Sequence, residues 1–319
     1  MTRVLRSRIF RRCCPPRASS SGASTTGSKL KLPDTPLILA GALGGPFVIF
    51  FLTPLRNALT LASQDADSSA LELYANTFHG GFCNGWTGGT APVLPSCPQF
   101  CVMGPLFHFL NEALGSVTFA VLVSAVAETT ISYGSQTLNA QLAFNHEQMQ
   151  SGSGLQVPLW NPFVPFGPGM TVHILRNILG MAGIRIFVAP SQAAVRRVVR
   201  LLGLPVPDGA QRFLGDLLSS MCAAMLSMPL AQCYNFAVTS QAYMHGSAVE
   251  RFQALQVFLS RSYLVHGPQG EVVGLSPTLG RDVFLRCAYV GVLYTLFGSI
   301  EKLFVALFAW RRRTTRSAD

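Results

Sequence analysis

Apolar residues are gathered into six long stretches along this chain, and polar segments separate the stretches. Each stretch is long enough to cross about 30 Å of hydrocarbon as a helix that rises about 1.5 Å per residue. The pattern therefore predicts six membrane-spanning helices, and an even number of crossings places both chain ends on the same side. The stretches cover about residues 37–61, 91–114, 117–144, 170–199, 213–244 and 277–310.

A glycine stands shortly before every second stretch, which indicates an internal repeat. Gly274 is followed by Pro277 and Gly89 by Pro92, and an apolar stretch follows in both places. Proline is tolerated in the first turn of a helix because the N–H that it lacks has no partner there. Gly169 precedes the fourth stretch in a similar way. The order of stretch, long loop and stretch therefore occurs three times.

Composition also favours a membrane protein. Charged residues make up only 12% of the chain and hydrophobic residues 49%, whereas a soluble domain has about 25% charged residues. The basic residues behind the formal net charge of +10 lie mainly at the chain ends and in one short segment. Basic residues next to apolar helices mark contact with lipid headgroups. Because no nucleic-acid-binding motif accompanies the charge, no nucleic-acid partner is expected.

The eight cysteines predict neither a disulfide framework nor a metal site. Most lie in apolar stretches, where cysteine usually acts as a small hydrophobic residue. Cys97 and Cys101 are spaced to share a helix face, but no second His or Cys pair completes a set of metal ligands. No Ser/His/acid set has a supporting motif either. We therefore expect no metal, no cofactor and no enzymatic activity.

Residues 1–33 are typical of a mitochondrial transit peptide. They are rich in arginine and serine and contain no acid before Asp34. Leaders with this composition direct proteins to organelles. The alternative is a disordered basic tail that lies on anionic lipid. A second basic tail, residues 311–319, follows Trp310, which is placed as an aromatic anchor at the membrane interface.

The stretches and their repeat resemble the mitochondrial carrier family over about residues 36–302. In that family each of three repeats has an odd-numbered helix, a short helix on the matrix side and an even-numbered helix. The odd helix kinks at a Pro-x-[Asp/Glu]-x-x-[Lys/Arg] signature. Gly41 and Gly45 precede the first kink at the family's spacing, and they predict close helix approach. The kink positions are Pro54, Ser132 (or Tyr133) and Pro229.

The resemblance implies an all-α membrane protein with six transmembrane helices in three pseudo-threefold repeats, which is the mitochondrial carrier fold. The implied division is the leader at 1–33, repeat 1 at 34–115, repeat 2 at 116–205, repeat 3 at 206–310 and the basic tail at 311–319.

The charges of the family signature are missing from this chain. In family members they form a ring of salt bridges that closes the matrix side, with attraction of a few kcal/mol per pair (about 4 at an effective dielectric near 20). A second charged motif, late in each even-numbered helix, also lacks its acids here. Closure would therefore need apolar or polar plugs. The family's acidic positions are occupied by Arg56, Gly134 (or Ser135) and Ala231, and its basic positions by Leu59, Thr137 (or Leu138) and Tyr234.

In the family, substrate is contacted at three points that follow the junction glycines by seven residues. An arginine kept at mid-membrane usually faces a water-filled cavity or a partner, and two in one cavity suit a carboxylate or phosphate. The alternative is structural pairing with Glu128, Asp216 or Asp282, or snorkelling to an interface. Arg185 and Arg286 are candidates for either role. The implied substrate-binding residues are Ser96, Arg176, Asn177, Arg281 and Asp282.

The resemblance implies transport of a small anionic metabolite (carboxylate, phosphate or nucleotide) by alternating access, with membrane lipid and the solute as partners. The missing charges favour an alternative, a non-transporting carrier fold that acts as a scaffold, membrane-remodelling factor or subunit of a larger mitochondrial complex. The expected location is the mitochondrial inner membrane, as a multi-pass protein. The arginines on the side of the termini oppose the usual charge bias of carriers, which leaves a different orientation or the outer membrane as alternatives.

Overall fold

The computed structural model describes residues 35–316, most of which are helical. The chain separates into residues 1–32 and residues 33–319, and the described residues belong to the second unit. The predicted leader and the last residues of the predicted basic tail lie outside the described residues. The predicted repeat boundaries after residues 115 and 205 fall in short links between helices, whereas the boundary after residue 310 lies inside a helix.

All six apolar stretches form helices. The first stretch forms α1 (Thr35–Leu39), the π-helical turn η2 (Ala40–Gly44), α2 (Gly45–Phe51) and α3 (Thr53–Ala62). The next three stretches form α5 (Thr90–Leu114), α6 (Val117–Gln150), α7 (Met170–Arg185) and α8 (Val188–Leu201). The last two form α9 (Asp208–Thr239) and α12 (Pro277–Arg316).

Shorter elements lie in two of the three long connections. The first connection contains α4 (Ala70–Asn76) and the 3₁₀ turn η3 (Phe82–Trp86). The last contains α10 (Gln241–His245), α11 (Ala248–Tyr263) and an antiparallel hairpin of β1 (Leu264–His266) and β2 (Val272–Leu275).

By length and composition, four of the described helices can cross a membrane: α5 (with the preceding η3), α6, α9 and α12. Two bent pairs, α2 with α3 and α7 with α8, raise the number to six if each pair is one span. The chain is therefore a mostly helical, multi-pass membrane protein by these criteria.

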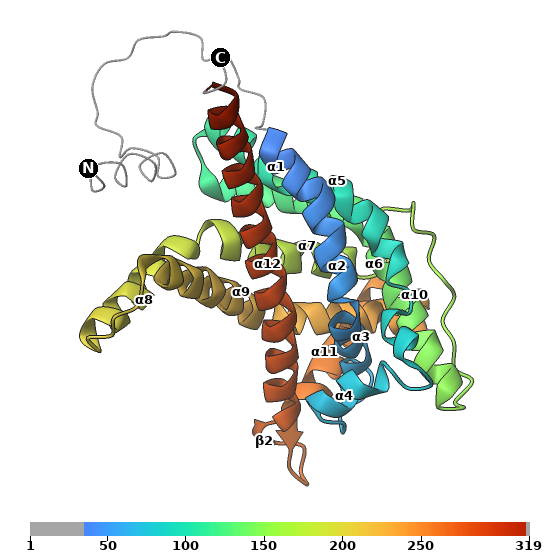
Figure 1. Cartoon of the computed structure of the whole chain (residues 1–319). Coiled ribbons are helices and arrows are strands. Elements are labelled where there is room, and N and C mark those ends of the chain that lie inside the picture. Colours follow the sequence, from blue (N-terminus) through green and yellow to red (C-terminus); the bar gives the residue numbers. More distant parts are fainter. Residues whose placement is uncertain (1–34, 317–319) are drawn as a thin grey trace. The chain divides into compact units, whose positions relative to one another are not determined.

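Each long helix contacts the next one along the chain, and the last contacts the first. α2 packs on α5, α5 on α6, α6 on α7, α7 on α9 and α9 on α12. α12 then returns to α1, η2, α2 and α3, so that the two ends of the described chain lie side by side (Figure 1). α3, α6 and α9 also contact one another.

The first helix breaks where Pro54 predicts a kink. Proline lacks the N–H that would bond to the carbonyl of Phe50, and its ring crowds the preceding turn. The axes of the segments before and after the break differ by 55°. The indole Nε1 of Trp86 donates to the Phe50 carbonyl over 2.9 Å, so the connection before α5 supplies the donor that Pro54 removes.

The other two predicted kink positions lie within unbroken helices. Ser132 is buried inside α6 and keeps its backbone N–H, and Pro229 lies inside α9. A second break occurs in the fourth apolar stretch, where the chain bends by 50° between α7 and α8. Pro190, in the first turn of α8, cannot donate to the carbonyl of Ile186, which lies at the break. The single helix predicted over residues 170–199 is therefore two helices.

The glycines of the first helix allow close packing on α5, as predicted. A Cβ at Gly41 would lie 2.9 Å from the backbone of Phe100, and one at Gly45 would lie 2.6 Å from its ring. Glycine is thus needed at both positions for α5 to approach η2 and α2 this closely.

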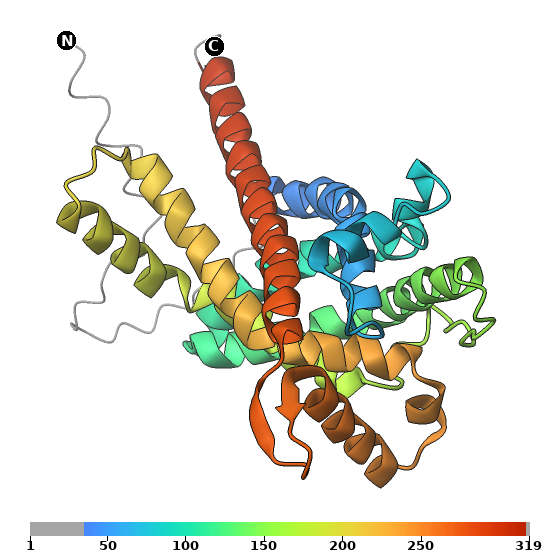
Figure 2. The same cartoon turned by 90° about the horizontal axis from the view of Figure 1, so that it is seen from below.

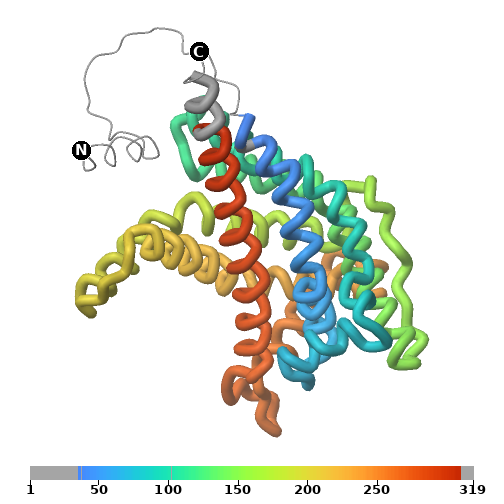
Figure 3. Tube along the Cα trace, in the orientation of Figure 1, coloured from blue at the N-terminus to red at the C-terminus, as the bar shows by residue number. Residues whose placement is uncertain are grey.

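The second long connection, residues 151–169, contains no helix and returns along α6 (Figure 3). The side chain of Asn145 bonds to both the N–H and the carbonyl of Val157, each over 2.8 Å. Gln141 accepts from the N–H of Trp160 over 2.6 Å. The backbone of this loop is therefore held by polar side chains of α6.

Candidate functional site

A small cavity lies where the long helices meet, and side chains of α2, α3, α5, α6, α7, α9 and α12 line it. Its volume is about 60 Å³, which is room for a few water molecules. Its charged lining residues are Arg56, Glu128, Arg176 and Arg286.

Arg176, on α7, is the most extensively bonded of the three arginines. Its Nη2 donates to Gln136 over 3.0 Å and to Nε2 of His173 over 2.6 Å, and its Nε donates to Asn177 over 3.1 Å. The guanidinium also lies 5.0 Å from the centre of the Tyr234 ring. All of these groups are polar or aromatic rather than acidic, so they orient Arg176 without neutralising its charge.

Arg56 and Arg286 have fewer partners. Arg56, on α3, donates to the carbonyl of Gln136 over 3.2 Å. Arg286, on α12, is 8% exposed, and its Nε has no hydrogen-bond partner among the described residues. The only carboxylate in the cavity wall, Glu128, accepts from Gln99 over 2.8 Å. Within residues 35–316, no ion pair joins Glu128 to an arginine.

Charge balance decides what this cavity can bind. Three guanidinium groups and one carboxyl group face it, so the site has an excess of positive charge. Guanidinium N–H groups are the natural ligands of carboxylates and phosphates. Among residues 35–316, no cluster of three His, Cys, Asp or Glu side chains is placed to hold a metal ion.

No protein-family model and no curated protein matches this sequence.

A set of neutral hydrogen bonds joins three helices beside the cavity, and we call this set of bonds the neutral closure. They join α3, α6 and α9, and all of their residues are buried. Thr137 and Tyr234 stand at two of the positions where the resemblance to carriers expects basic residues. The closure is thus polar but contains no ion pair. The bonds are Asn139 to Asn57 (3.3 Å), Thr137 to Tyr234 (2.9 Å) and Asn235 to the carbonyl of Leu59 (3.0 Å).

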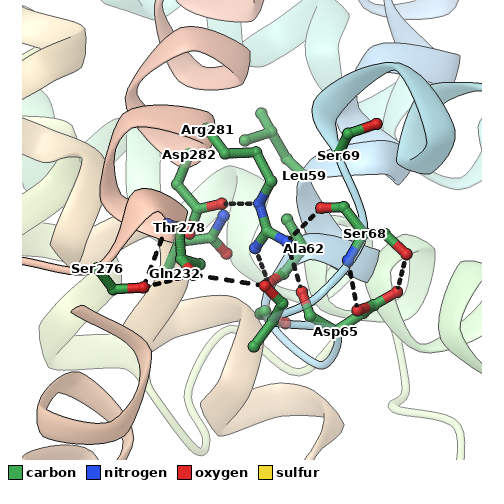
Figure 4. A network of polar contacts seen from close by, with 12 residues as sticks. Leu59, Ala62, Asp65, Ser68, Ser69, Gln232, Ser276, Thr278, Arg281 and Asp282 are labelled. Carbon is green, nitrogen blue, oxygen red and sulfur yellow. Dashed lines mark hydrogen bonds and ion pairs between the residues drawn. The ribbon is translucent and has the colours of Figure 1, made fainter. Parts of the chain in front are cut away.

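Arg281 forms a clamp between α12 and the end of α3 instead of facing the cavity (Figure 4). Its guanidinium donates to the carbonyls of Ala62, Asp65 and Ser68 over 3.0, 2.7 and 2.9 Å. Its Nε is also 2.9 Å from Asp282. Carbonyls at the end of a helix lack intrahelical donors, so the guanidinium fills this need. The sequence left two roles open for Arg281, and these bonds are those of the structural role.

The surroundings of the clamp are also polar and bonded. The hydroxyl of Tyr263 donates to Asp282 over 2.9 Å; burial, and next the Asp282 carboxylate, raise the pKa of this phenol. Partial burial alone would raise the pKa of Asp65, but hydrogen bonds from Ser68 and Asp67 outweigh burial and lower it. The loop after α3 is therefore organised by an ionised Asp65.

The structure brings together only part of the predicted substrate-binding set. Arg176 and Asn177 line the cavity, whereas Arg281 and Asp282 do not. Ser96 is fully buried in α5 and donates to the carbonyl of Val93 over 2.6 Å, outside the cavity wall. Arg286, one of the two further candidates, lines the cavity.

Arg56 is a cavity residue that the predicted substrate-binding set does not contain. In the sequence it stands at the acidic position of the signature, two residues after Pro54. In the carrier family this position contributes to the ring of salt bridges, so its place in the motif is a usable signal. Glu128, named only as a pairing partner, is likewise part of the cavity wall.

Proposed function

We propose that this chain is a divergent, carrier-like membrane protein that transports a small anion by alternating access through the arginine-lined cavity. The substrate class is a carboxylate, phosphate or nucleotide. The threefold glycine pattern and the closed order of helix contacts support a fold of three helix pairs. The basic leader supports a location in mitochondria, with the inner membrane as the first choice and the outer membrane as the alternative.

The observation that carries the proposal is the set of three arginines that face one cavity and, among residues 35–316, form no ion pair with an acid. Burying a charge is costly unless an opposite charge or strong hydrogen bonds compensate it. Arg176 is compensated by hydrogen bonds, but Arg286 leaves its Nε unpartnered among the described residues. An anion in the cavity would supply the missing acceptor, and bidentate contacts with arginine would give it specificity.

The neutral closure supports alternating access rather than a fixed plug. A neutral hydrogen bond contributes about 1 kcal/mol net, which is less than the attraction of a partly buried ion pair. Three such bonds can hold α3, α6 and α9 together and still separate at modest cost. The small volume of the cavity describes a closed state, and a substrate would enter only after the helices on one side move apart.

The close packing of side chains between the helices favours a second function. Phe100 and Phe297 meet with ring centres 4.6 Å apart between α5 and α12, and the cavity holds only about 60 Å³. A carrier fold that no longer opens would act as a scaffold, a membrane-remodelling factor or a subunit of a larger mitochondrial complex. This alternative needs no substrate and predicts a stable association with other proteins.

The two functions are separated by an uptake measurement. The purified full-length protein is placed in liposomes, and uptake of labelled phosphate, nucleotides and carboxylates is compared with uptake by protein-free liposomes. Transport predicts saturable uptake of at least one anion class and competition by unlabelled anion. Absence of uptake across the panel, together with purification in a large stable assembly, would contradict transport and favour the scaffold.

A further inference from the structure

α8 is held along the first half of α9 by one face. These two segments lie on the opposite side of α12 from α2 and α3 (Figures 1 and 2). Gln192 donates to Asp216 over 2.8 Å. A Cβ at Gly215 would lie 2.5 Å from Cγ of Gln192, so the two helices approach closely there. α8 is therefore a fixed helix with a second face turned away from α9.

An apolar stripe lies near the C-terminal end of α8. Val198 and Leu201 are three residues apart, and Leu202, four residues after Val198, directly follows the helix. They are 52%, 76% and 64% exposed. Leu204, just after α8, is also half exposed. An exposed apolar cluster of this kind marks a contact with lipid or with another molecule.

Three arginines lie beside the apolar stripe. Arg196 and Arg200 are four residues apart and share a face, with Arg197 next to them, and all three are exposed. Residues 186–207 contain no acid, so this segment has a local charge of three positive units. Charge complementarity therefore favours a surface of negative charge as its partner.

The position of the break fits a helix that leaves the hydrocarbon. α7 has 16 residues and rises about 24 Å at 1.5 Å per residue, so it covers most of the about 30 Å of hydrocarbon and the start of α8 completes the crossing. The chain then bends by 50° before the arginines of α8. A helix with an arginine-rich face next to an apolar face is the pattern of helices that lie in the membrane interface.

We infer that α8 is an interfacial arm that binds anionic phospholipid. Arg196, Arg197 and Arg200 contact lipid phosphates, and Val198, Leu201 and Leu202 enter the boundary between headgroups and acyl chains. This binding does not depend on whether the protein transports a solute, because it uses neither the cavity nor the neutral closure.

Hydrogen–deuterium exchange tests the inference on the full-length protein in nanodiscs. One set of discs contains phosphatidylcholine alone, and the other contains phosphatidylcholine with phosphatidylglycerol. We expect peptides that cover residues 188–202 to exchange about tenfold more slowly in the anionic discs, because each of three arginines gains attraction to the charged surface. Peptides from α6 serve as a control for the fold and should exchange equally in both.

Two matched variants separate charge from helix structure. The combined variant Arg196→Gln, Arg197→Gln, Arg200→Gln should lose the difference between the two lipids, whereas the combined change of the same residues to Lys should keep most of it. Equal exchange of the wild-type segment in both lipids would overturn the inference and leave this face for a protein partner. A lipid difference that persists in the Gln variant would overturn the role of the arginines.

Discussion

The hydroxyl of Tyr234 joins α9 to α6 through its hydrogen bond with Thr137. Both residues are buried, and Tyr234→Phe keeps the ring beside Arg176 while removing this bond. Loss of this bond lowers the stability of the closed state by about 1 kcal/mol. The ratio of open to closed protein then rises about fivefold. We expect Tyr234→Phe to raise the initial rate of anion uptake into liposomes by up to about fivefold.

Tyr74→Phe, an exposed tyrosine on α4, is the matched control and should leave uptake unchanged. An unaltered uptake rate in Tyr234→Phe, accompanied by a lower melting temperature, would show that the Thr137 bond supports the fold without limiting opening.

Arg281 also makes a prediction at the scale of one side chain. Its guanidinium bonds to three carbonyls and to Asp282, so Arg281→Gln leaves the buried Asp282 carboxyl group with the Tyr263 hydroxyl but without its charged partner. Truncation of such a network costs about 3 kcal/mol or more. We expect the melting temperature of Arg281→Gln in detergent to fall well below that of Arg261→Gln, which removes an exposed arginine of α11.

Because Arg281 lies outside the cavity wall, a transported anion should still raise the melting temperature of the Arg281→Gln protein. If the variant is as stable as the wild type and its melting temperature no longer rises with the anion, Arg281 belongs to the binding site.

At the scale of elements, the break between α2 and α3 depends on a donor from another segment. Trp86 provides that donor to the Phe50 carbonyl, and Trp86→Phe removes it while keeping an aromatic ring. The lost bond contributes about 1 kcal/mol to the free energy of unfolding. Its loss should lower the melting temperature by about 2–4 °C for a chain of this size class. Differential scanning fluorimetry checks the value.

Trp160→Phe removes a comparable indole bond, to the Val164 carbonyl inside the loop after α6, and should leave the α2/α3 region unchanged in hydrogen–deuterium exchange. If Trp86→Phe alters neither the melting temperature nor exchange near Phe50, the indole does not stabilise the break.

The positions of the helices could be predicted from the sequence because membrane-crossing segments must be long and apolar. Gly41 and Gly45 also predicted a close helix contact correctly. The break before α8 was not predicted, although Pro190 lies inside the fourth stretch. The kink expected at Ser132 depended on alignment with a family motif rather than on the residue itself, since serine keeps its backbone N–H.

The candidate site was only partly predictable because helix starts are offset from the junction glycines. Gly169 directly precedes α7, whereas Gly274 lies in β2 and α12 begins only at Pro277. Arg281 is therefore in the first turns of α12, where it reaches the end of α3. Arg286, further along the same helix, reaches the cavity. Counting from a glycine cannot detect this offset, because β2 continues to Leu275 before α12 begins.

For the whole molecule, the proposed six crossings would place Cys83 and Leu204 on opposite sides of the membrane. Cys83 is exposed in η3 after the first crossing, and Leu204 is half exposed after the fourth. In a background without other cysteines, Cys83 and Leu204→Cys should react with a membrane-impermeant maleimide from opposite faces of sealed vesicles. Labelling of both from one face would mean that α7 and α8 form a re-entrant pair and do not cross.

The most direct measurement of the central claim is uptake by Arg286→Gln compared with Arg261→Gln, using the anion that wild-type liposomes take up best. Both changes remove one positive charge, but only Arg286 lines the cavity. A charge-assisted hydrogen bond contributes about 1.5–3 kcal/mol, so kcat/KM should fall by about tenfold or more in Arg286→Gln. Arg261→Gln should stay within about twofold of the wild type. Equal uptake by the two variants, with both proteins folded, would contradict anion transport through this cavity.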